Sequence, residues 1–220
     1  MNKDSLYQKS YINRLGEFSK LSNEAFRSFT NFDQKALSQG KLSSKLKELI
    51  AVAVAHVTGC PYCIEAHVNQ VKKQEATKEE MAEAIMVATA LKAGSALAHG
   101  VNALNAYDGN NNDDELYKSN YINRLSEFSS LQKETFSSFI SFDQNAMKAG
   151  KLSVKEKELI AIAIAHVTGC PYCIEIHVKA AKKAQVTKEE MAEAIMVATA
   201  LKAGSALAHG VNALNAYDEN

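Results

Sequence analysis

The chain of 220 residues contains the same sequence twice, and this repeat constrains its fold more than any other feature. Residues 6–108 align without a gap on residues 116–218 at a constant offset of 110, so each copy has 103 residues. The stretch 77–108 recurs letter for letter at 187–218. A tandem duplication predicts two equivalent domains, 1–108 and 116–220. Residues 109–115 between them are polar and rich in Asn and Asp, so we assign them to a linker.

Hydrophobic residues within each copy recur at the spacing of helices. Spacings of three and four predict two N-terminal helices, the second carrying Phe26, Phe29 and Phe32, which we interpret as core or subunit contacts. Ser43 is a candidate N-cap for a third helix that ends near Val57. No segment alternates with period two, so we predict an all-α fold of two tandem helical bundles.

Capping signals mark where further helices begin. Thr77 and Glu80 form a capping box, as do Ser153 and Glu156 in the second copy. From Thr77 the helical pattern continues to about Ala106, with a bend or break expected at residues 93–95 (Ala-Gly-Ser). The apolar, alanine-rich stretch 82–98 is more than one bundle can bury, so we expect each copy to associate with a like copy.

Charge and composition exclude several classes of partner. Lys plus Arg and Asp plus Glu both number 25, so no basic excess exists to bind nucleic acid or an anionic membrane surface. The longest stretch without an ionised residue, 159–174, has 16 residues, fewer than the roughly 20 of a membrane span. The N-terminal residues lack the apolar region of a secretory signal. We therefore expect no membrane partner and a cytoplasmic location, where cysteines stay reduced.

The two prolines of the chain both lie inside a Cys-Pro-Tyr-Cys element. Because proline suits the first position of a helix, Cys60 and Cys63 are expected at a helix N-terminus, which lowers a thiol pKa. The two cysteines can close a disulfide, and His67 lies four residues after Cys63 on the same helical face, where it can exchange a proton with the thiol. This spacing predicts redox and acid–base chemistry.

A carboxylate joins each set from the preceding helix. Glu48 lies twelve residues before Cys60 and is placed to orient the imidazole and relay a proton. The second copy repeats the whole set as Glu158, Cys170, Cys173 and His177. These eight residues are the candidate catalytic residues.

Plainer interpretations exist for the same residues. The cysteines could be small buried hydrophobic residues, or Cys60, Cys63 and His67 could offer three ligands to zinc, but a closed structural site needs four, so we expect no metal. His56 and His166 lie near a helix end and suit its dipole. The third histidine pair, at positions 99 and 209, is expected to be packed or at an interface.

The spacing of Glu, Cys, Cys and His resembles the core motif of the alkylhydroperoxidase D family, within the carboxymuconolactone decarboxylase superfamily. The resemblance covers each motif and the helices that follow it, most of each copy. It implies a thiol peroxidase in which the second cysteine (Cys63, Cys173) attacks a hydroperoxide and the first (Cys60, Cys170) forms the disulfide. It further implies a Glu–His proton relay, a dithiol or lipoyl-type protein as reductant, and no cofactor.

Other functions remain open at this stage. A general thiol-disulfide oxidoreductase or a redox sensor would use the same cysteines, and a decarboxylase relative would lack the pair. Glutaredoxins share the Cys-Pro-Tyr-Cys string but require a sheet. The resemblance implies that relatives with one copy per chain form higher, often three-fold, oligomers. For this chain it implies a homo-oligomer of three two-copy chains. Within the chain, we expect the two halves to pack about a pseudo-two-fold axis.

Overall fold

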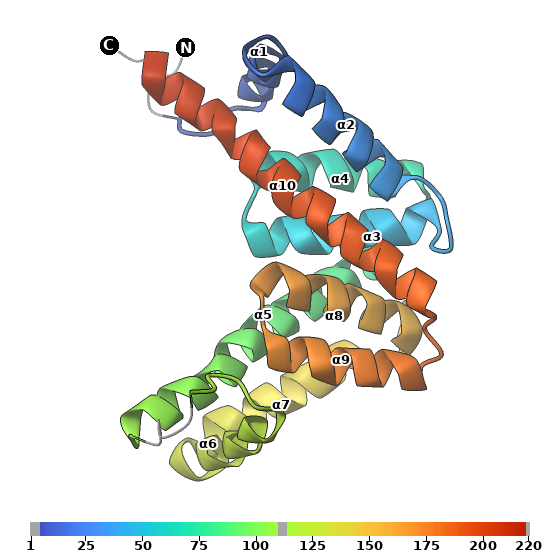
Figure 1. The fold of residues 1–220 in the computed structure, drawn as a ribbon. Coiled ribbons are helices and arrows are strands. Elements are labelled where there is room, and N and C mark those ends of the chain that lie inside the picture. Colours follow the sequence, from blue (N-terminus) through green and yellow to red (C-terminus); the bar gives the residue numbers. More distant parts are fainter. Residues whose placement is uncertain (1–4, 110–113, 219–220) are drawn as a thin grey trace.

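The computed structural model describes residues 5–109 and 114–218, and within these ranges every regular element is helical, which confirms the all-α prediction. Most of the linker, residues 110–113, lies outside the described ranges. The first copy forms η1 (Lys9–Arg14), α1 (Leu15–Leu21), α2 (Asn23–Leu37), α3 (Ser44–Thr58), α4 (Pro61–Lys73) and α5 (Lys78–Tyr107). The second copy repeats these as η2 (Ser119–Arg124), α6 (Leu125–Leu131), α7 (Lys133–Met147), α8 (Val154–Thr168), α9 (Pro171–Lys183) and α10 (Lys188–Asp218) (Figure 1).

Side chains cap the helices as the sequence predicts. The Ser43 hydroxyl accepts a hydrogen bond from the Leu46 amide at 3.2 Å. Both capping boxes form, and in the first the Glu80 carboxylate and the Thr77 hydroxyl accept each other's backbone N–H groups at 2.6 and 3.1 Å. Gly59 ends α3 with φ of 69°, in the left-handed region that favours glycine.

The two copies exchange their long C-terminal helices. α5 of the first copy packs against α6, α7 and α9 of the second, and α10 packs against α1, α2 and α4 of the first. Figure 1 shows α2 beside α10 near one end of the molecule and α7 beside α5 near the other. α2 and α7 therefore have their main partners in the other copy, and the contacts of the two halves mirror each other as the pseudo-two-fold arrangement expected from the repeat requires.

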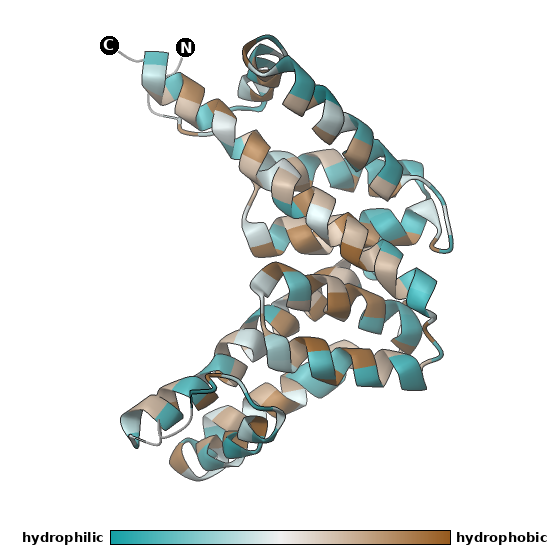
Figure 2. Ribbon diagram, in the orientation of Figure 1, coloured by the Kyte–Doolittle hydropathy of each residue, from teal (hydrophilic) through white to brown (hydrophobic). Residues whose placement is uncertain are grey.

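α3 and α8 form the centre of the core and pack against each other across the pseudo-two-fold axis. Residues 46–55 of α3 and 157–165 of α8 are all buried. Hydrophilic residues lie along α2 and α4, whereas hydrophobic residues gather in the middle of α10 (Figure 2). By length and composition α5 and α10 could each cross a membrane, which the charge pattern did not anticipate. Both pack against α3 and α8, as core helices do.

Of the bend or break expected at residues 93–95, the break is wrong, because α5 and its equivalent α10 continue without interruption. Glycines further along the same two helices serve close packing. A Cβ atom at Gly100 would lie 2.8 Å from Cζ of Phe128, and one at Gly210 would lie 2.8 Å from Cζ of Phe18. Glycine in these helices therefore admits phenylalanine rings from the other copy.

Buried ion pairs also join the copies. The Glu193 carboxylate on α10 accepts the backbone N–H groups of Lys41 and Leu42 at 2.7 and 3.0 Å, and Lys47 Nζ lies 3.0 Å from it. The Lys47 side chain is only 4% exposed. Glu83 on α5 makes the equivalent contacts with the second copy. Both glutamates thus bind the segment before the central helix of the opposite copy.

Candidate active site

Each Cys-Pro-Tyr-Cys element begins a helix, as the sequence predicts. Cys60 is the N-cap of α4 with Pro61 in the first turn, and its sulfur accepts the backbone N–H of Cys63 at 3.2 Å. Cys60 and Cys63 form a disulfide, with Cα atoms 5.3 Å apart. Cys170 and Cys173 are free thiols with the equivalent contact at 3.3 Å. The helix start therefore holds the two sulfur atoms within bonding reach.

The structure brings the predicted glutamate and histidine together in both copies. His67 Nδ1 on α4 lies 2.8 Å from Glu48 Oε2 on α3, and the corresponding distance from His177 to Glu158 is 2.9 Å. Glu48 and Glu158 are buried. Because a carboxylate only accepts hydrogen bonds, it fixes the proton on Nδ1 and leaves Nε2 as an acceptor. Such an imidazole can receive a proton from a neighbouring thiol.

The two cysteines of each pair differ in exposure. Cys60 and Cys170 are 0% exposed, whereas Cys63 and Cys173 are 8% and 6% exposed. All four cysteines are thus buried, and the second residue of each pair is slightly nearer the surface.

Electrostatics place the thiolate on the first cysteine. A hydrogen bond from the Cys173 thiol lowers the pKa of Cys170 to about 6, against the effect of burial, with help from a backbone amide, the Ser95 hydroxyl and His99. The same hydrogen bond and burial raise the pKa of Cys173 above its usual value. The reduced pair thus carries one negative charge near neutral pH. The charge is centred on the Cys170 sulfur, which accepts a hydrogen bond from the Cys173 thiol.

Sequence reasoning missed an aspartate in each site. Burial raises the pKa of Asp143 on α7, His177 opposes that rise and Glu158 adds to it. Its charge also raises the pKa of Cys173. Asp33 on α2 is the half-buried equivalent, and burial raises its pKa too. Asp33 directly follows Phe32 in an apolar stripe, and a charge in that position was a signal that the stripe borders a site.

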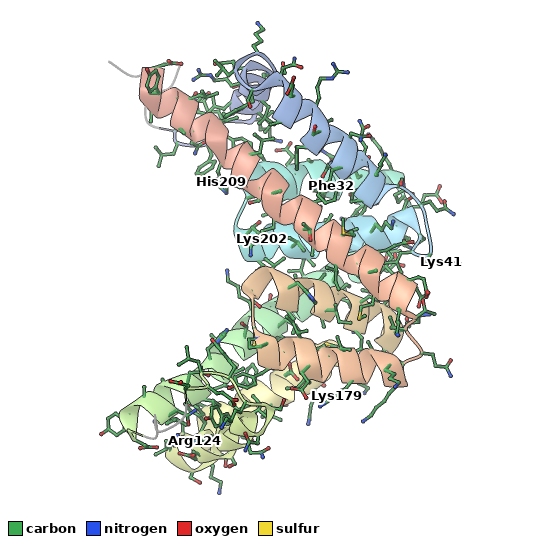
Figure 3. The ribbon with its side chains drawn as sticks, in the orientation of Figure 1. Phe32, Lys41, Arg124, Lys179, Lys202 and His209 are labelled. Atoms are coloured by element: carbon green, nitrogen blue, oxygen red, sulfur yellow. A yellow bond between two sulfur atoms is a disulfide. The ribbon has the colours of Figure 1, made fainter. Side chains whose placement is uncertain are left out.

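The sites also receive residues from the opposite copy. Ala98 of α5 belongs to the buried cluster around Cys170 and Cys173, and Ala208 of α10 belongs to the cluster around the first-copy pair. His209 lies on α10 where this helix passes α4 (Figure 3), and its Nδ1 atom is 3.3 Å from the Tyr7 hydroxyl. The prediction of packed or interface histidines fits this position.

The remaining candidate residues make contacts within their own helices or with the core. His56 and His166 bind carbonyl oxygens of their own helices, with Nδ1 2.8 Å from the oxygens of Val52 and Ile162. Phe32 packs partly buried against the core. Among the residues that the structure describes, no group of three or more His, Cys, Asp and Glu side chains is arranged to hold a metal ion.

Each copy of this all-helical fold therefore carries a cysteine pair at a helix start and a Glu–His pair beside the core. The sequence profile described as the carboxymuconolactone decarboxylase family matches residues 23–106 and again residues 133–216. The chain therefore belongs to the carboxymuconolactone decarboxylase family, and it carries two tandem copies of the family domain.

Individual relatives agree with this assignment. The chain is 44% identical over 94 residues to uncharacterized protein 4 in cox locus of Paracoccus denitrificans, over 43% of this chain and 85% of that protein. It is 30% identical over 112 residues to an uncharacterized protein of Cupriavidus necator, over 50% of this chain and 99% of the relative. These relatives are thus about one copy long.

The fold has a counterpart among solved structures. A candidate gamma-carboxymuconolactone decarboxylase subunit from Burkholderia xenovorans LB400 superposes with a TM-score of 0.67, over 97% of this chain and 98% of that one. The two sequences are 18% identical, so the likeness concerns the fold.

Proposed function

We propose that this protein is a thiol peroxidase that reduces hydroperoxides at two dithiol sites. The observation that carries the proposal is a buried cysteine pair at a helix N-terminus, a disulfide in the first copy and a dithiol in the second. The same helix carries an imidazole that a buried glutamate orients at 2.8 Å in one copy and 2.9 Å in the other. A dithiol alone is a general redox group. A thiol proton also needs an acceptor before sulfur can attack oxygen, and the Glu–His pair supplies one.

The reaction begins with Cys173, the more exposed residue of its pair. Its thiol proton moves to Nε2 of His177, and the sulfur attacks one oxygen of the hydroperoxide. The O–O bond breaks, the cysteine becomes a sulfenic acid, and the departing alkoxide takes the proton from His177 and leaves as an alcohol. The first copy follows the same course through Cys63 and His67.

The second step closes the disulfide. The Cys170 thiolate attacks the sulfur of the Cys173 sulfenic acid, the S–S bond forms, and hydroxide leaves and is protonated to water. The two thiols have then supplied two electrons and the hydroperoxide has become alcohol and water. The lowered pKa of Cys170, about 6, favours this step because a thiolate is the attacking species.

A reductant must restore the thiols, and we propose a dithiol or lipoyl-type protein. The first cysteine is fully buried, so the reductant would attack the sulfur of Cys63 or Cys173. A second function, general thiol-disulfide exchange, is favoured by the low pKa of Cys170, a property typical of an N-cap cysteine in oxidoreductases. Because that sulfur is buried, small substrates suit the site better than folded proteins.

Stopped-flow oxidation tests the proposal. The reduced protein is mixed with hydrogen peroxide and, separately, with cumene hydroperoxide. We expect the C63S/C173S variant to consume no peroxide and the C60S/C170S variant to stop after one turnover as a sulfenic acid that dimedone traps. The opposite pattern would reverse the two roles. A wild-type protein that peroxide does not oxidise, but that exchanges disulfides with a lipoyl peptide, would favour the second function.

A further inference from the structure

The face of α5 that meets the second copy carries polar residues at helical spacing. Ser95, His99 and Asn102 occupy positions i, i+4 and i+7, so they lie along one side of the helix. Asn102 Oδ1 accepts a hydrogen bond from the Tyr172 hydroxyl at 3.4 Å. This side of α5 therefore lies over the Cys-Pro-Tyr-Cys element of the other copy.

The first of these residues lies beside the dithiol of the second copy. Ser95 is only 4% exposed, and Ala98, one turn further along α5, belongs to the buried cluster of Cys170. Hydrogen bonding from the Ser95 hydroxyl lowers the pKa of Cys170. Thr89 on the same helix behaves differently, because its exposed hydroxyl donates to the Ile85 carbonyl at 2.8 Å. Hydroxyls inside helices commonly bond back to their own helix in that way. Ser95 instead places its donor in the dithiol site.

The repeat places the same arrangement at the first site. Ser205 on α10 is 4% exposed, and Ala208, one turn further on, belongs to the cluster around Cys60 and Cys63. Asn212 Oδ1 accepts a hydrogen bond from the Tyr62 hydroxyl at 3.4 Å. Both dithiol sites are thus covered by the long helix of the opposite copy.

We propose that each site is completed in trans by a serine that holds the first cysteine as a thiolate: Ser95 acts on Cys170 and Ser205 acts on Cys60. A hydroxyl donates a hydrogen bond to a thiolate more strongly than to a thiol, so it favours the charged form. The inference gains its catalytic meaning from the proposed function, but thiolate formation is measured without any peroxide.

Several other groups face the dithiol of the second copy and act on the same equilibrium. Cys173 and Tyr172 lie on the same helix as Cys170, His99 lies on α5, and Asp143 acts on Cys173 from α7. Tyr121 of η2 packs beside the cluster. All of these groups remain present in the S95A variant, so a shift confined to the second copy is attributed to the loss of the hydroxyl.

The test is iodoacetamide labelling of the fully reduced protein from pH 4 to 9, read by peptide mass. Peptides from the two copies differ in mass because residues such as Val52 and Ile162 differ, so one sample reports both sites. We expect S95A to raise the labelling pKa of the second-copy dithiol by about one unit, close to tenfold less thiolate at low pH, and to leave the first copy unchanged. S205A should do the converse.

Two further variants separate the hydroxyl from the fold. S95T keeps a hydroxyl and should retain the wild-type pKa, whereas T89A removes a hydroxyl from the outer face and should shift neither site. Equal shifts in both copies, or no shift in a variant with wild-type helicity, would overturn the inference. A crossed shift in a protein that does not turn over peroxide would keep the inference and reject the proposed function.

Discussion

Replacing Glu193 with alanine tests how the two copies are held together. The change removes the carboxylate that pairs with Lys47 at 3.0 Å and accepts hydrogen bonds from the backbone amides of Lys41 and Leu42. Removing one partner of a buried ion pair costs about 3–5 kcal/mol. Because the Glu193 side chain is 25% exposed, and the Lys47 ammonium still donates to the Ser38 carbonyl at 2.6 Å, we expect the lower end, about 3 kcal/mol.

The assay is urea unfolding at pH 7, followed by circular dichroism. E189A is the matched control, because Glu189 is an exposed carboxylate in the first turn of the same helix, and it should lower the free energy of unfolding much less than E193A does. Adding K47M to E193A removes the unpaired charge and should recover at least about 1 kcal/mol. A loss below about 1 kcal/mol for E193A, or an equal loss for E189A, would refute the reasoning.

The pH dependence of that loss has a definite sign. Burial opposes ionisation of Glu193, but the amides of Leu42 and Lys41 and the ammonium of Lys47 outweigh it and hold the pKa below the usual 4.5. A group whose pKa is lower in the folded state contributes stability above its unfolded pKa. The difference between wild type and E193A should therefore be complete at pH 7 and shrink as the pH falls below about 4.5.

Three further predictions concern other parts of the molecule. As the pH falls, the second-copy dithiol of the reduced wild-type protein should lose half of its reactivity toward iodoacetamide near pH 6, the pKa of Cys170. A midpoint near pH 9 would contradict the thiolate assignment. G100L should lower the free energy of unfolding by about 1–3 kcal/mol because its side chain meets Phe128, whereas G16A, with no atom within 4 Å, should not destabilise the protein. Light scattering should give three times the chain mass of 24.0 kDa, and a value near 24.0 kDa would rule out the three-chain assembly.

Much of the local structure could be predicted from the sequence because its causes are local. The hydroxyl of Ser43, the capping boxes and the proline at the start of α4 act within one helical turn, so residue identity and spacing suffice. The pairing of His67 with Glu48 required only that α3 and α4 pack side by side. Each of these predictions used residues close together in one copy.

The remainder depends on contacts between distant residues. Gly94 suggested a bend or break because of its residue type. In the structure it lies beside Phe139 of the other copy, and nothing near position 94 in the sequence reveals that contact. Asp33 and Ser95 reach the sites through packing of α2 and α5, which no short spacing encodes. Because the two copies are nearly identical, the sequence also does not show whether each long helix packs against its own copy or against the other one.

The exchanged helices have a consequence for dilution. A chain with a single copy would build this arrangement only by meeting a second chain, so the population of complete sites would fall with protein concentration. Here both partners belong to one chain, and their effective concentration is set by the connection between them and not by the amount of protein. The two sites should therefore remain whole in the most dilute sample. Removing one long helix should uncover one site and also loosen both central helices, because α5 and α10 each pack against α3 and α8.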